Sequence, residues 1–166
     1  MPDNRDLDRV YLAIGKFQVN WSVFEYELYR FTKIIYANCP TFIPAKFPDG
    51  IAGKIALLKR VLKKEPRLSG ISADGLKLTK ALWLHLKLRH LIVHGSIAHI
   101  ENSSTLTFFR PLEIGDGPLK RAERVQVELS QIEMEAQEME DRSLELGLFG
   151  SQFEDALPIP PGSHSP

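Results

Sequence analysis

The sequence has little cysteine and no long run of uncharged apolar residues. Cys39 is the only cysteine, so no internal disulfide bond and no cysteine-based zinc site can form. No stretch of about 18 uncharged apolar residues is present, and residues 1–8 are acidic and polar. We therefore expect no membrane-spanning helix and no secretory signal, and we predict a cytoplasmic protein.

The chain also lacks a net charge, but its charges are separated along the sequence. Residues 51–95 carry ten basic and two acidic side chains, a net charge of +8. Residues 96–166 carry five basic and thirteen acidic side chains, a net charge of −8. This separation has two interpretations: a basic surface for a phosphate-bearing partner, or two parts that attract each other within or between chains.

Length and composition predict one folded domain. The 166 residues include 43% hydrophobic and 25% charged residues, which is typical of a globular protein. We predict a mainly α fold, a bundle of about four helices in residues 1–150, with a small β element at about residues 96–129. Four prolines in residues 151–166 indicate a disordered tail.

Heptad spacing of apolar residues predicts a long first helix, from an N-cap near Asp6 or Asp8 to about Asn38. Its apolar positions are separated alternately by four and three residues, as in a packing seam. They are Val10, Ile14, Phe17, Trp21, Phe24, Leu28, Phe31 and Ile35. Glu25 borders this seam, where it could pair with a buried arginine.

The middle of the chain predicts two further helices. Residues 38–53 contain three prolines and two glycines together with Phe42 and Phe47, which predicts a packed loop. A short basic helix follows at residues 54–64. The next helix is apolar nearly all round, so we expect it to be central and buried, Trp83 included.

The pattern changes after Gly95. Residues 97–101 and 105–112 predict a hairpin, and the alternation in residues 124–129 predicts a third strand. Ser130 and Glu133 have capping-box spacing and predict the start of an acidic last helix. We expect Gly147 and Gly150 to end that helix.

The segment Arg89-His90-Leu91-Ile92-Val93-His94-Gly95 carries the densest group of polar side chains in an apolar helix. A buried unpaired charge is unfavourable by several kcal/mol, so Arg89 must reach water, a carboxylate or a phosphate. His90 and His94 are one helical turn apart on one face. Gly95 predicts a left-handed helix end that leaves His94 at the solvent.

This segment resembles the motif of the HEPN superfamily, small helical domains of prokaryotic defence and toxin–antitoxin systems. The motif reads Arg89, His90, three apolar residues, His94 and Gly95. The family most often has asparagine after the arginine, so His90 departs from the commonest form. No tyrosine follows His94 as in toxins paired with minimal nucleotidyltransferases, which puts that pairing in doubt. The long first helix with Trp21 and Glu25, and the closing helix, extend the resemblance.

The resemblance implies metal-independent RNA cleavage without a cofactor, in a site shared by two subunits of a homodimer. His94 would act as general acid or base, and Arg89 would hold the phosphate. His90 would position the phosphate or supply a second imidazole. Glu25 would support Arg89. Lys54, Lys80 and Lys87 are candidates for an RNA path, and a cognate antitoxin or regulatory protein is an expected partner.

Two other interpretations of the motif compete with the nuclease. In the first, the protein is a catalytically inactive dimeric module that binds RNA, a partner protein or a small ligand, and His94 complements the helix dipole. In the second, which we disfavour, His85, His90 and His94 hold a divalent metal. No carboxylate stands between the last two histidines, as it does in the HExxH motif.

Overall fold

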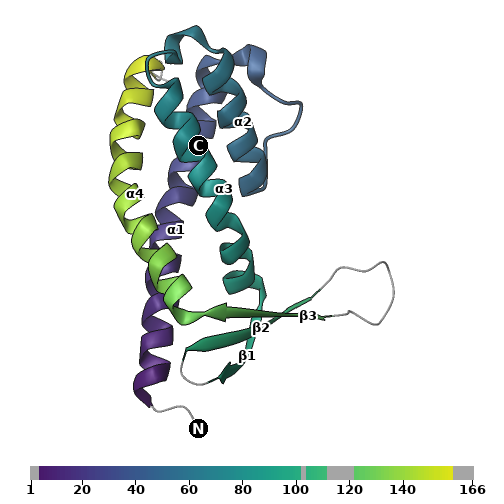
Figure 1. Ribbon diagram of the computed structural model, residues 1–166. Coiled ribbons are helices and arrows are strands. Elements are labelled where there is room, and N and C mark those ends of the chain that lie inside the picture. Colours follow the sequence, from purple (N-terminus) through teal and green to yellow (C-terminus); the bar gives the residue numbers. More distant parts are fainter. Residues whose placement is uncertain (1–3, 102–103, 112–121, 159–166) are drawn as a thin grey trace. The chain divides into compact units, whose positions relative to one another are not determined.

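The computed structural model describes residues 4–101, 104–111 and 122–158. Within them the chain forms four α-helices and a three-stranded antiparallel sheet before the last helix (Figure 1). The helices are α1 (Asn4–Asn38), α2 (Ile51–Lys64), α3 (Ser72–His94) and α4 (Leu129–Ala156). The strands are β1 (Ser96–Glu101), β2 (Thr105–Pro111) and β3 (Ala122–Glu128), and two short 3-10 helices are η1 (Pro40–Phe42) and η2 (Pro66–Leu68). This confirms the predicted mainly α fold.

The contacts of the chain group into two compact units. Met1–Trp21 and His85–Glu140 form the first unit, and Ser22–Leu84 and Asp141–Pro166 form the second. Three of the four helices, α1, α3 and α4, contribute residues to both units. Each unit therefore joins segments that are distant in the sequence.

The predicted seam of α1 is buried over nearly its whole length. Seven of its eight positions are at most 2% exposed, and Ile14 is half-buried. Phe17 and Trp21 stack in the first unit with ring centroids 6.3 Å apart. Because the seam is continuous, α1 supplies core side chains to both units.

The first unit combines the sheet with three helix segments. The strands follow the order β1-β2-β3, and Leu106 and Phe108 in β2 pair with Val127 and Val125 in β3. Leu106 and Phe108 are fully buried, so this side of the sheet forms part of the core. The backbone N–H of Leu129 donates to Ser104 O at 2.6 Å, which joins the start of α4 to the sheet.

The second unit has a core of aromatic side chains from α1 and α4. The Phe31 ring contacts Phe149 edge-on at 5.5 Å and Phe153 at 5.0 Å between centroids. Arg30 binds Glu27 at 2.8 Å and Glu154 at 3.0 Å. These contacts hold the end of α4 against α1.

The prediction that Gly147 and Gly150 end the last helix is wrong, because α4 continues to Ala156. Phe153 and Leu157 are fully buried, and burial of these side chains favours continued helix over a loose tail. Gly150 is buried beside the Arg30 guanidinium, whose end a Cβ there would displace.

The prediction that α3 is buried all round is also wrong. Leu82, Leu86 and Leu91 are buried, whereas Trp83 is 54% exposed and Leu84 is 67% exposed. Apolar composition alone does not reveal which side of a helix has a neighbour. The exposed side of α3 therefore needs a separate explanation.

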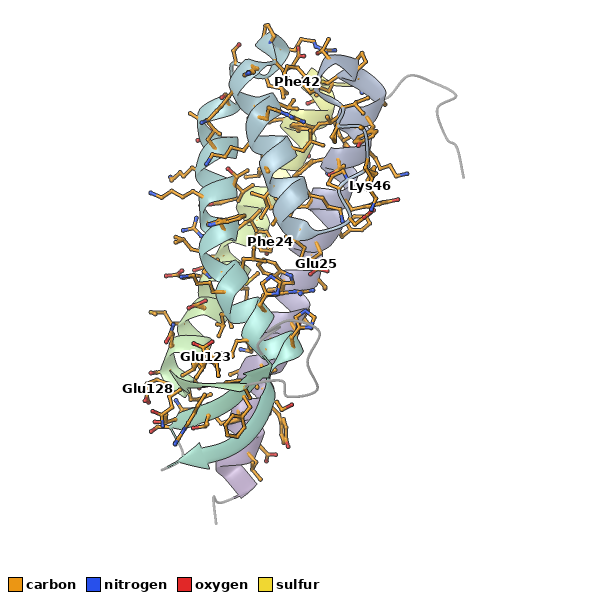
Figure 2. The ribbon with its side chains drawn as sticks, turned by 90° about the vertical axis from the view of Figure 1, so that its right-hand side faces the viewer. Phe24, Glu25, Phe42, Lys46, Glu123 and Glu128 are labelled. Atoms are coloured by element: carbon orange, nitrogen blue, oxygen red, sulfur yellow. The ribbon has the colours of Figure 1, made fainter. Side chains whose placement is uncertain are left out.

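The connection between α1 and α2 is packed, as predicted (Figure 2 labels Phe42 and Lys46 along it). The Phe47 ring lies 5.0 Å from Tyr36 and 6.2 Å from Tyr29 between centroids. The helix that follows begins at Ile51, three residues before the predicted start.

At the end of α2, Glu65 accepts hydrogen bonds from Arg67 Nε at 2.7 Å and from the Arg67 backbone N–H at 3.3 Å. Arg67 Nη2 donates to Asn38 O at 2.9 Å, which ties η2 to the end of α1. Buried Cys39 lies beside this pair. Burial, with Glu65 nearby, raises the pKa of the Cys39 thiol.

Some predictions fall outside the described residues. These are the turn at residues 102–103, the loop within residues 113–120, residues 1–3 and the tail from residue 159. The prediction of an N-cap near Asp6 or Asp8 is wrong, because α1 already begins at Asn4 and includes both residues. Within the described residues, no helix has both the length and the apolar content needed to cross a bilayer.

Candidate functional site

The predicted motif lies at the C-terminal end of α3 in the first unit. The backbone N–H of Gly95 donates to Leu91 O at 2.8 Å, and β1 begins at the next residue. The predicted left-handed conformation of Gly95 is wrong, because its φ lies outside that range. Glycine is favoured here because there is no room for a side chain. A Cβ would collide with Leu91 O and approach the Phe108 ring at 3.3 Å.

Arg89 and His94 are in direct contact. Nη1 of Arg89 lies 3.2 Å from Nε2 of His94. Arginine is always a donor, so this hydrogen bond requires Nε2 to be unprotonated, with the ring proton on Nδ1. Arg89 is half-buried and His94 is exposed, as the sequence predicted for a residue at the end of the helix.

His90 stacks on His94. The two ring centroids are 5.7 Å apart with an interplanar angle of 26°, and both residues are exposed. Two imidazoles and one guanidinium thus occupy a single turn and a half of helix. Such a group places two imidazoles, each able to take up or release a proton, beside a permanent positive charge.

His85 takes no part in this cluster. It is buried in the first unit, where Nδ1 lies 3.2 Å from Glu135 Oε2 and Nε2 lies 3.7 Å from Glu138 Oε2. Its two ring nitrogens therefore face acidic residues of α4, in disagreement with a metal site shared with His90 and His94. Among the described side chains, no group of three or more histidine, cysteine or acidic residues has the geometry of a metal site.

The predicted supporting residues are distributed over both units. Lys87 is exposed in the first unit, on the same face of α3 as His90 and His94 because it precedes them by three and seven residues. Glu25 lies on α1 in the second unit (Figure 2), as do Lys54 and Lys80 on their own helices.

The two lysines of the second unit differ in their surroundings. Lys54 is half-buried, and its Nζ lies 5.8 Å from the centroid of the Tyr29 ring, so part of its role is a cation–π contact. Lys80 is exposed. Lys87 is thus the one predicted RNA-binding lysine that lies in the unit of the motif.

The sequence interpretation missed the pairing of His85 with Glu135 and Glu138. A signal for it was present, since a histidine on the apolar side of a helix requires a polar partner. The two acids are three residues apart, so they share one face of α4. What the sequence could not supply was which acidic helix packs there.

The role of the motif has to be inferred from its geometry. Comparisons with protein-family models, curated protein sequences and solved structures gave no match. The HEPN resemblance therefore stays a prediction from the motif. What the first unit does provide is a half-buried arginine with two exposed histidines at a helix end.

Proposed function

We propose that the protein is a metal-independent endoribonuclease of the HEPN type, with Arg89 and His94 at its reactive centre. The observation that carries this proposal is the 3.2 Å contact between Arg89 Nη1 and His94 Nε2 at the exposed end of α3. Phosphodiester cleavage by the 2′-oxygen uses a positive charge at the phosphate and a proton acceptor at the 2′-OH. A phosphate oxygen beside Arg89 would lie within reach of the imidazole.

The reaction is an intramolecular transfer at phosphorus. The ribose 2′-oxygen bonds to the adjacent phosphorus while one imidazole takes the 2′-OH proton, and the bond from phosphorus to the 5′-oxygen breaks. A second proton donor protonates that leaving oxygen, so the products are a 2′,3′-cyclic phosphate and a 5′-hydroxyl. Arg89 holds the phosphate oxygens, and His94 takes up or releases the proton that is transferred. His90 positions the phosphate or supplies the second proton.

A single chain offers few groups for this chemistry, so the proposal includes a homodimer in which the motif helices of two subunits share the site. Lys87 extends the positive charge next to the motif, and Lys54 and Lys80 add further RNA contacts. A free ribonuclease damages its own cell, so a cognate antitoxin or regulatory partner in the cytoplasm belongs to the same proposal.

The test is cleavage of a structured RNA by the purified protein in EDTA. His94→Ala and Arg89→Ala should each lower the rate at least about 100-fold, the size expected for a positioned acid–base group. Lys59→Ala removes an exposed charge on α2 and serves as the matched control, with a rate within about twofold of wild type. The wild-type products should end in 2′,3′-cyclic phosphates.

The opposite outcome supports the inactive binding module. No cleavage by folded wild-type protein, or equal cleavage by all variants, would overturn the nuclease proposal. The contact between Arg89 and His94 would then be structural, with both side chains completing the end of α3.

A further inference from the structure

Three leucines and a tryptophan stay exposed on α3 and α4 within the second unit. Leu84 is 67%, Leu144 75%, Leu148 71% and Trp83 54% exposed. A lone exposed apolar side chain is common on proteins and needs no explanation. Several on two adjacent helices are typical of an interaction surface.

The two helices run side by side in this unit (Figure 1). Side chains of both helices line a hollow of about 270 Å³. Both contribute to its lining, which consists of Asp74, Lys77, Leu78, Glu145, Leu148, Phe149 and Gln152. Leu144 precedes Leu148 by one turn on the same side of α4. Leu84 follows Lys77 by seven residues, on the same side of α3. Leu148 therefore lines the hollow itself, and helical spacing places Leu144 and Leu84 on the same sides of α4 and α3.

The two sides of this groove carry opposite charges. Lys77 is exposed on α3, and Asp141 and Glu145 are exposed on α4. Lys77 and Glu145 line the same hollow from its two helices. When two copies are related by a two-fold axis that runs along the groove between them, the α3 side of each copy faces the α4 side of the other. A basic side then meets an acidic side twice.

We infer that this surface, the α3–α4 face (Lys77, Leu84, Leu144, Glu145 and Leu148), is where a second copy of the chain docks. Lys77 of one subunit faces Glu145 of the partner subunit, and the exposed leucines of both copies pack in the shared groove. The same patch then serves on both subunits, which is the requirement for a closed dimer.

The chemistry of the face disfavours a nucleic acid as the occupant. RNA phosphates would be repelled by Asp141 and Glu145, and the three leucines would remain in water. A protein surface covers the leucines and neutralises both signs of charge. Because each charge finds its complement on an identical copy, the face needs no second kind of protein.

The inference rests on the proposed function in one respect, since a shared active site requires two copies. Its own evidence lies in the second unit, and association is measured separately from cleavage. If association responds to the α3–α4 face while RNA stays intact, the nuclease proposal fails and this inference stands. If RNA is cleaved by a monomer, the inference fails and the reaction stands.

The first experiment is sedimentation equilibrium of the full chain up to about 100 µM, a range that detects weak dimers. Wild type should be a dimer, and Leu148→Glu should raise the dissociation constant at least about 30-fold by placing a charge in the groove. Leu12→Glu is the matched control, because Leu12 is a 60% exposed leucine on α1 in the first unit. A monomeric wild type, or an equal response of both variants, would overturn the inference.

The second experiment reverses the charges one at a time. Lys77→Glu and Glu145→Lys should each weaken self-association about tenfold or more, because like charges then face each other twice. An equimolar mixture of the two variants should form heterodimers, since every facing pair is again opposite in sign. Circular dichroism verifies that each variant is folded. Failure of the mixture to associate more tightly than either variant alone would contradict the proposed facing pairs.

Discussion

At the scale of single residues, the sequence predicted how side chains are placed where one helix determines it. Arg89, His90 and His94 lie together because their spacing on α3 requires it, and the helix end exposes His94. Contacts that depend on a neighbouring element were not predictable. The pairing of His85 with Glu135 depends on how α4 packs, and Gly95 is needed for space against Leu91 and not for its φ.

The crowding at Gly95 gives a direct test. Gly95→Ala should lower the free energy of unfolding by about 1–3 kcal/mol, because the added methyl group meets Leu91 O. Gly15 lies within α1 with open space at its Cβ position, so Gly15→Ala should raise the free energy of unfolding by about 0.5–1 kcal/mol. Urea denaturation of both variants measures the difference. Equal effects of the two substitutions would contradict the assigned crowding.

The hydrogen bonds from Arg67 lower the pKa of the Glu65 carboxyl. A lowered pKa in the folded state stabilises the protein above the ordinary carboxyl range, and this contribution is lost as pH falls through the folded value. Wild type should exceed Glu65→Gln in stability by about 1 kcal/mol at pH 7, and the difference should shrink below about pH 4.

The measurement is thermal or urea unfolding of both proteins across that pH range. Glu133→Gln is the comparison, because Arg9 also lowers the pKa of Glu133 but both side chains are more exposed. Its effect should be at most about 0.5 kcal/mol. A difference between wild type and Glu65→Gln that grows toward acid pH would contradict the expected direction of this pH dependence.

At the scale of elements, periodicity predicted the helices better than their ends and faces. The seam of α1 was correct because a 3–4 spacing over a long helix leaves one way to pack. The end of α4 was misjudged because glycine was interpreted as a stop, whereas Phe153 and Leu157 continue to bury surface. The exposure of Trp83 was missed because an apolar residue looks the same in sequence whether or not another element covers it.

The extended end of α4 makes a testable contribution to the second unit. Phe153→Ala should lower the free energy of unfolding by about 3–5 kcal/mol, because a fully buried ring against Phe31 is replaced by a cavity. Gln152→Ala, at the exposed neighbouring position, should change it by at most about 0.5 kcal/mol. Urea unfolding measures both. A loss below about 1 kcal/mol for Phe153→Ala would mean that this turn of α4 is dispensable.

At the scale of the whole molecule, composition predicted a folded, mainly α chain but not the grouping of its contacts. We expected one domain in residues 1–150, and the contacts cluster into two units that α1, α3 and α4 all enter. Sequence-distant segments make up each unit, so no boundary in composition marks them. The charge separation remains visible at this scale, with the basic excess in α2 and α3 and the acidic excess largely in α4.

A chain with no net charge and separated charges should attract its own copies most strongly near neutral pH. We expect the second virial coefficient to be lowest near pH 7 at low salt and to rise when salt screens the opposite charges. Static light scattering at several pH values and salt concentrations measures it. Leu148→Glu, tested in parallel, separates this general attraction from docking at the α3–α4 face. A maximum near pH 7 at low salt would contradict the expectation.

The placement of the two tryptophans gives the protein a spectroscopic probe in each unit. Trp21 is 2% exposed in the first unit, and Trp83 is 54% exposed in the second. Acrylamide should therefore quench one emitting population readily and the other hardly at all, with the shielded population at shorter wavelength. Replacing either indole by phenylalanine leaves a single emitter, so the opening of each unit can be followed without any attached dye.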